Sequence, residues 1–108
     1  MRQLLRLEPR PDAVFCFNDP LAIGAMSCAL DEGLRIPEDI ALIGCGNLNY
    51  DDTLRVPLSS IDQRSRLIGE ETARVTLAIL RSKVPPQAES IVLKPELVVR
   101  ASTQKRRN

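Results

Sequence analysis

An apolar segment that ends on two polar residues is the feature that most constrains the fold of this chain. Residues 13–17 read Ala-Val-Phe-Cys-Phe, and Asn18 and Asp19 follow directly. A short continuous apolar run of this kind is typical of a buried strand. Pro20 then suits the first turn of a helix, so we expect Asp19 to cap a helix over residues 20–32.

A second apolar segment, residues 40–45, ends in the same way on Gly46 and Asn47. A strand, a helix and another strand in this order predict two parallel neighbours in one sheet. Ligands of open α/β sheets bind just beyond the carboxyl ends of such strands. The two polar ends therefore predict one shared small-molecule site.

The remaining chain fits the same α/β class. Residues 59–62 are expected to form a short strand or a crossover segment. Residues 65–80 should form a helix with an apolar stripe at helical spacing: Ile68, Thr72, Val75 and Ile79. Two short strands, 91–93 and 97–101, are separated by Pro95 and should lie near a sheet edge. Residues 1–7 resemble the end of a helix, and residues 104–108 a polar tail. We expect a parallel sheet flanked by helices.

Composition narrows the possible functions. Aromatic residues make up only 3% of the chain and the formal net charge is +1, so nothing drives the chain as a whole toward nucleic acid or a membrane. The chain has no histidine, and its three cysteines have no metal-binding spacing. A small enzyme with Cys16 or Cys45 as nucleophile would lack the usual activating base. We expect no catalytic residue, no metal and no cofactor.

Six segments together resemble the effector-binding domain of the lactose/galactose-repressor family, which shares its fold with periplasmic sugar-binding proteins. They follow one another in the family's order and spacing, and they cover nearly the whole chain: residues 11–19, 21–25, 32–40, 42–44, 57–63 and 94–103. The resemblance implies a periplasmic-binding-protein-like fold. It also implies a sugar-responsive transcriptional repressor in which effector binding between two lobes changes DNA affinity.

The resemblance further implies that residues 1–108 are a partial effector-binding domain. Residues 11–62 and 94–103 would belong to the C-terminal lobe, and the helix over 65–82 to the N-terminal lobe. The DNA-binding domain of the family lies upstream and is absent from this chain, so DNA would be a partner only through that domain. A cytoplasmic homodimer without membrane contact is expected, formed through the helix that carries Ala25, Met26 and Ala29 and through residues 54–60.

The resemblance assigns an effector site to Asn18, Asp19, Gly46, Asn47 and Gln63. Asn18 matches a residue that hydrogen-bonds sugar hydroxyls, and Gln63 matches a glutamine where the chain crosses between lobes. Gly46 stands where the family has a carboxylate that holds two hydroxyls, so the identity of the sugar is open. A turn role for Asn47 is equally compatible with the sequence. The alternative function is a binding protein for sugar uptake, which a signal peptide upstream would indicate.

Overall fold

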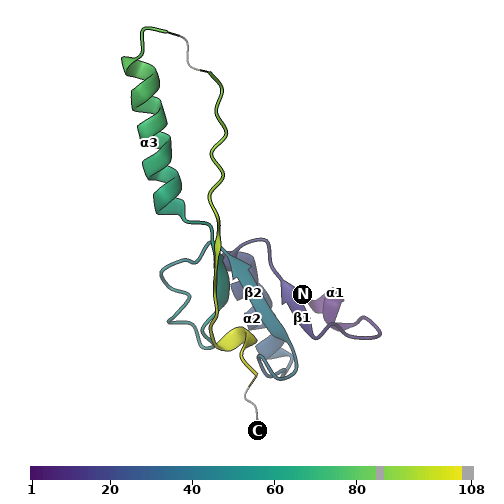
Figure 1. Cartoon of the computed structure of the whole chain (residues 1–108). Coiled ribbons are helices and arrows are strands. Elements are labelled where there is room, and N and C mark those ends of the chain that lie inside the picture. Colours follow the sequence, from purple (N-terminus) through teal and green to yellow (C-terminus); the bar gives the residue numbers. More distant parts are fainter. Residues whose placement is uncertain (85–86, 106–108) are drawn as a thin grey trace.

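The computed structural model describes residues 1–84 and 87–105, and the end of the expected polar tail lies outside them. Figure 1 shows the elements, which follow one another in an alternating α/β order. They are α1 (Arg2–Leu5), β1 (Ala13–Phe15), α2 (Asp19–Asp31), β2 (Ala41–Cys45), β3 (Ser59–Asp62), α3 (Ser65–Arg81), β4 (Glu96–Val98) and a short 3₁₀ helix, η1 (Ala101–Thr103). None of the described helices is long and apolar enough to cross a membrane.

The four strands form one sheet in the order β1-β2-β3-β4. β1 pairs with β2 and β2 pairs with β3 in parallel, whereas β3 and β4 are antiparallel. The expected α/β class and the parallel pairing of the first two strands are therefore confirmed. Because β1, β2 and β3 run in the same direction, their carboxyl ends lie at the same edge of the sheet.

α2 begins one residue earlier than expected, and its cap is Asn18 rather than Asp19. The Asn18 side chain accepts a hydrogen bond from the backbone N–H of Leu21 at 2.9 Å. Asp19 is the first helical residue and is fully buried toward the sheet. The prediction that Asp19 caps the helix is wrong, because its carboxylate has other hydrogen-bond donors on β3 and on the loop after β2.

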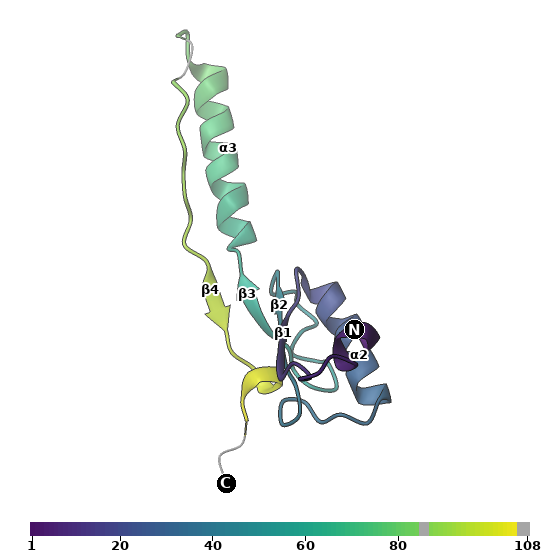
Figure 2. The same cartoon turned by 90° about the vertical axis from the view of Figure 1, so that its right-hand side faces the viewer.

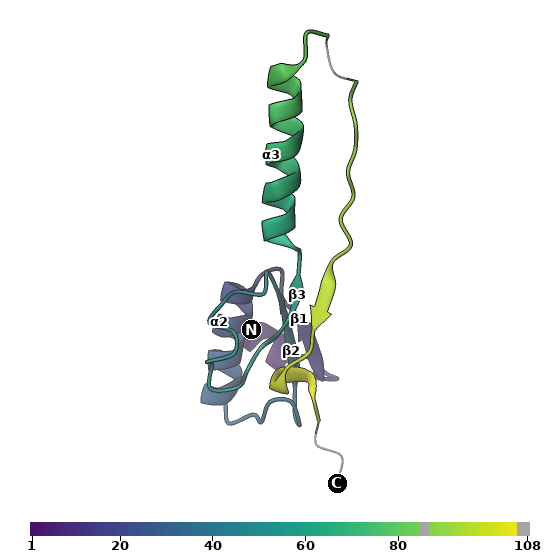
Figure 3. The ribbon, with the colours of Figure 1, turned by 60° about the vertical axis from the view of Figure 1, so that its left-hand side comes forward.

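The core lies between α2 and one face of the sheet, as Figure 2 and Figure 3 show. Its helical side consists of small and flexible residues, and its sheet side of Ile40, Leu42 and Leu58, which have no exposed surface. Ala25, Met26 and Ala29 face this core and are at most 8% exposed. The expectation that these three side chains form a subunit contact is therefore wrong, because the sheet of the same chain already covers them.

α3 projects away from the sheet together with the segment that returns to β4 (Figure 1). The molecule measures 62 × 26 × 21 Å as a result. No residue of α3 is buried, and Ile68 and Ile79 are 46% and 44% exposed. Residues 91–93 form no strand, contrary to expectation, since their neighbour in this arm is a helix and offers no ladder of backbone hydrogen bonds.

Ser102 in η1 joins two strands through a buried hydroxyl. The hydroxyl donates to the carbonyl of Leu42 at 2.6 Å and accepts from the backbone N–H of Ser59 at 2.8 Å. Ser102 has no exposed surface, so water cannot replace either partner. η1 thereby fastens the end of the chain to β2 and β3.

We predict that Ser102→Ala lowers the free energy of unfolding by about 1–3 kcal/mol, because it leaves a buried carbonyl and a buried N–H unpaired. Urea denaturation followed by circular dichroism measures the loss. Ser90→Ala is the matched control: Ser90 is exposed, so its removal should change stability by less than about 0.5 kcal/mol. Equal effects of the two variants would contradict a structural role for the Ser102 hydroxyl.

Candidate functional site

Polar residues follow all three parallel strands at the shared edge of the sheet. Asn18 follows β1, Gly46 and Asn47 follow β2, and Gln63 follows β3. The β2–β3 register pairs Cys45 with Ile61, and the N–H of Gly46 donates to the carbonyl of Ile61 at 2.8 Å. The end of β2 therefore lies beside the end of β3 at this edge, and α2 brings Asp19 to it.

The amide of Asn18 is only partly engaged by the protein. Its oxygen caps α2 by accepting from Leu21, and the side chain is half-buried. Within residues 1–84 and 87–105 its amide nitrogen has no hydrogen-bond partner. Asn18 can thus hold the helix with one atom and donate to a ligand with the other.

Asp19 lies over β2 and joins three elements. Its carboxylate accepts from the Ser60 hydroxyl at 2.6 Å and from the backbone N–H of Leu48 at 3.0 Å. A Cβ atom at Gly44 would lie 2.1 Å from Asp19 Oδ1, so only glycine leaves room for this carboxylate. Asp19 has no exposed surface, and its side chain serves the interior of the protein.

Gly46 and Asn47 both have left-handed backbone conformations, with φ angles of +129° and +51°. Glycine adopts such a conformation without steric cost, and asparagine tolerates it better than most residues. A Cβ at Gly46 would also lie 3.3 Å from Asp19 Oδ2. A carboxylate at position 46 would therefore be strained in this chain, which explains why the position is a glycine.

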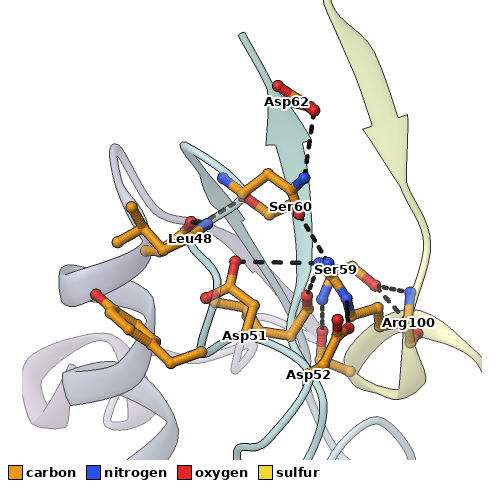
Figure 4. Close-up of polar contacts among 12 residues, drawn as sticks. Leu48, Asp51, Asp52, Ser59, Ser60, Asp62 and Arg100 are labelled. Carbon is orange, nitrogen blue, oxygen red and sulfur yellow. Dashed lines mark hydrogen bonds and ion pairs between the residues drawn. The ribbon is translucent and has the colours of Figure 1, made fainter. Parts of the chain in front are cut away.

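The Asn47 side chain is bonded within the protein at both ends. Its nitrogen donates to Asp62 at 3.3 Å, and its oxygen accepts from the Arg100 guanidinium at 2.7 Å. Its backbone N–H donates to Ser60 at 3.0 Å. Figure 4 shows Ser60, Asp62 and Arg100 between β3 and the segment after β4. This arrangement favours the turn role that the sequence left open for Asn47.

Arg100 is the residue that sequence reasoning missed most completely. Besides Asn47, its guanidinium donates to the carbonyl of Leu58 at 2.8 Å and forms an ion pair with Asp52. It thereby fixes residues 46–57, which are most of the loop between β2 and β3, to the segment after β4. Nothing local in the sequence signals this role, because its partners lie more than forty positions away.

Asp51, in the same loop, is buried without a compensating donor. It has no exposed surface, and neither carboxyl oxygen has a hydrogen-bond partner in the part of the chain that the structure describes. The Arg100 guanidinium is 4.0 Å from it. Burial raises the pKa of Asp51 to about 6, and the neighbouring Asp19 carboxyl acts in the same direction.

Gln63 faces a different space from the other expected site residues. Its side chain lines an open groove of about 460 Å³ between α3 and residues 89–93, together with Ile68, Val75 and Leu93. It follows directly on Asp62, to which Asn47 donates. Gln63 thus lies where the sheet edge meets the projecting arm.

Substitutions at two glycines test the close approach of Asp19 to the sheet. We predict that Gly44→Ala lowers the free energy of unfolding by about 3 kcal/mol or more, since the methyl group would displace a carboxylate with two buried donors. Gly24→Ala in α2 is the control: nothing lies within 4 Å of its added Cβ, and alanine favours the helix by about 0.5–1 kcal/mol. Thermal unfolding should give a lower midpoint temperature for Gly44→Ala and a higher one for Gly24→Ala. An unchanged midpoint for Gly44→Ala would contradict this packing.

Residues 1–103 match the model of the periplasmic binding protein-like domain. Among curated proteins, the chain is 39% identical over 105 residues to the HTH-type transcriptional repressor PurR of Mannheimia succiniciproducens. It is 35% identical over 102 residues to the repressor of the same name from Vibrio atlanticus. These alignments cover 97% and 94% of this chain but only 31% and 30% of the relatives. The chain thus spans less than a third of their length.

Solved structures agree with this relationship. A LacI family transcriptional regulator from Arthrobacter sp. FB24, solved in complex with lactose, superposes with a TM-score of 0.85 at 32% identity, covering 94% of this chain and 38% of that one. The transcriptional regulator CelR, solved in complex with cellobiose, gives a TM-score of 0.81 at 31% identity, covering 94% and 31%. The chain belongs to the periplasmic binding protein-like domain family, in the form that LacI-type transcriptional regulators carry.

Proposed function

We propose that this chain is part of the effector-binding domain of a sugar-responsive transcriptional repressor. The observation that carries the proposal is the sheet edge, where the carboxyl ends of three parallel strands gather Asn18, Gly46 and Asn47 beside the crossing to α3. Two similar regulators were solved with lactose and with cellobiose, which supports a sugar as effector. The curated relatives are repressors, which favours this function over sugar uptake.

We propose further that the effector binds between two lobes. Residues 11–62 and 94–103 form one lobe with the sheet, and the arm of α3 and residues 87–93 is a part of the other. The chain leaves the sheet after β3 and re-enters it at β4, so both crossings lie next to Gln63. A ligand held by Asn18 and Gln63 would contact both lobes, and its binding would favour their closure.

In this proposal the DNA contacts come from a part of the repressor outside this chain, and the protein acts in the cytoplasm, where its operator is. Lobe closure would alter DNA affinity, which is a coupling between two distinct sites. In the full-length repressor, a gel-shift titration should show that the sugar which binds also changes the affinity for operator DNA. A sugar that binds tightly without changing DNA affinity would argue for a binding protein of the uptake class.

Two substitutions at position 18 separate ligand binding from helix capping. Asn18→Ala removes both functions of the side chain, whereas Asn18→Ser keeps a good N-cap and removes the amide donor. In the full-length protein we predict that both weaken sugar binding by about 1–3 kcal/mol, because a sugar hydroxyl loses its partner. Only Asn18→Ala should also lose about 1 kcal/mol of stability.

Isothermal titration calorimetry with a panel of mono- and disaccharides, lactose and cellobiose included, gives the affinities, and thermal unfolding gives the stabilities. If Asn18→Ser keeps full affinity for the sugar, Asn18 serves only as a helix cap and does not contact the ligand. Loss of affinity in both variants, with stability lost only in Asn18→Ala, would support the contact.

We also propose that the chain forms at least a homodimer. Each large side chain of the α3 stripe gains roughly 1.5–3 kcal/mol when it is buried, and Ile68 and Ile79 are nearly half exposed in the single chain. In the 108-residue chain alone, a second copy that covers this stripe in place of the rest of the second lobe would recover that free energy. Light scattering in dilute solution should therefore give at least twice the mass of one chain.

The double variant Ile68→Gln/Ile79→Gln should lower the measured mass toward that of one chain. The double variant Arg66→Gln/Arg81→Gln changes two polar residues at the ends of the same helix and should leave the mass unchanged. A wild-type monomer that unfolds cooperatively would contradict the dimer.

A further inference from the structure

Two carboxyl groups are buried where α2, the 46–57 loop and β3 meet. Asp19 begins α2 and Asp51 lies in the loop, and neither has any exposed surface. The Asp19 carboxyl already accepts from Ser60 and from the backbone of Leu48. The Asp51 carboxyl lies beside Asp19, and neither Asp51 oxygen has a hydrogen-bond partner among the described residues. A buried charge without a donor is costly and is normally neutralised.

In the described structure, Arg100 contacts Asp51 more weakly than it contacts its other partners. Arg100 approaches it only to 4.0 Å, and the guanidinium directs its hydrogen bonds to Asn47, the Leu58 carbonyl and Asp52. Two ionised carboxylates have no proton between them and repel each other, whereas one proton allows the protonated group to donate to the other. Asp51 would then be the donor, since Asp19 is occupied as an acceptor.

We propose that Asp19 and Asp51 share one proton and act as a proton-dependent latch that fixes the 46–57 loop to α2. The Asp51 hydroxyl donates to an Asp19 oxygen, and no covalent bond changes. When the proton leaves, two facing carboxylates loosen the segment from Leu48 to Asp51. The latch concerns the interior of this chain, so it stands or fails independently of the proposed effector.

The direction of the pH dependence follows from the raised pKa of Asp51. Folding favours the protonated form, so the stabilisation is complete below the ordinary carboxyl pKa of 3.8 and is lost as the pH rises through about 6. The unfolding equilibrium constant should rise roughly tenfold between pH 5 and pH 7.5. The pKa of Asp39 is held well below its usual range by Arg35, so that carboxyl stays ionised throughout this interval.

The direct test is a ¹³C NMR titration of the aspartate side-chain carboxyls in the 108-residue chain. We expect Asp51 to titrate near pH 6, accompanied by faster amide exchange at Leu48 on the alkaline side. Titration of every aspartate below pH 5 would overturn the latch. The titration is repeated with millimolar Mg²⁺ to test for a cation in place of the proton. A lowered midpoint would overturn the proposal in favour of a metal site.

Variants supply the second test. Asp51→Asn places a permanent donor opposite Asp19, so its urea midpoint should be the same at pH 5 and pH 7.5. The matched control is Asp52→Asn, the neighbouring residue bound to Arg100, which should keep the wild-type dependence on pH. Equal pH dependence in Asp51→Asn and wild type would also overturn the proposal.

Discussion

The structure depends on one close approach, that of the Asp19 carboxylate to the backbone of β2. Gly44 leaves room for it, the Ser60 hydroxyl and the Leu48 N–H bind it, and the helix that begins at Asp19 then covers the sheet. Helix, two strands and loop are thus positioned by a single side chain. An apolar residue at position 19 could fill the same space, but it would leave two buried donors without acceptors.

The sequence predicted the elements well and their polar contacts poorly. Periodicity and apolar runs correctly indicated the positions of β1, α2, β2, β3 and α3, because those signals are local. The burial expected for the first run is wrong, because Phe15 and Phe17 are 60% and 82% exposed. The exchange of roles between Asn18 and Asp19 could not be predicted, since both residue types cap helices and the choice rests on donors about thirty and forty positions away. The same holds for Arg100, whose partners are distant in sequence. Residues 91–93 do not form the expected strand, because their β propensity cannot replace a neighbouring strand that supplies hydrogen-bond partners.

The polar residues at the sheet edge divide into two groups by what they bind. Asp19, Asn47, Ser60 and Arg100 are occupied with one another and hold the 46–57 loop in a fixed shape. The Asn18 amide nitrogen and Gln63 are the expected site residues whose polar atoms are not so occupied in the described structure. Most of the polarity that made this edge resemble a binding site therefore preorganises it, and only a small part is available to a ligand.

The junction between sheet and arm has a mechanical consequence. The chain crosses it twice, and the two crossings are paired at Asp62 and Glu96 and joined by the ion pair of Arg64 with Glu96. Arg64 has a left-handed φ of +61°, with its N–H held by Asp62 at 2.7 Å. A single connecting segment would let the arm swivel in any direction. Two paired segments restrict twisting of the arm more than bending, so we expect any movement of the arm relative to the sheet to be hinge bending at this junction.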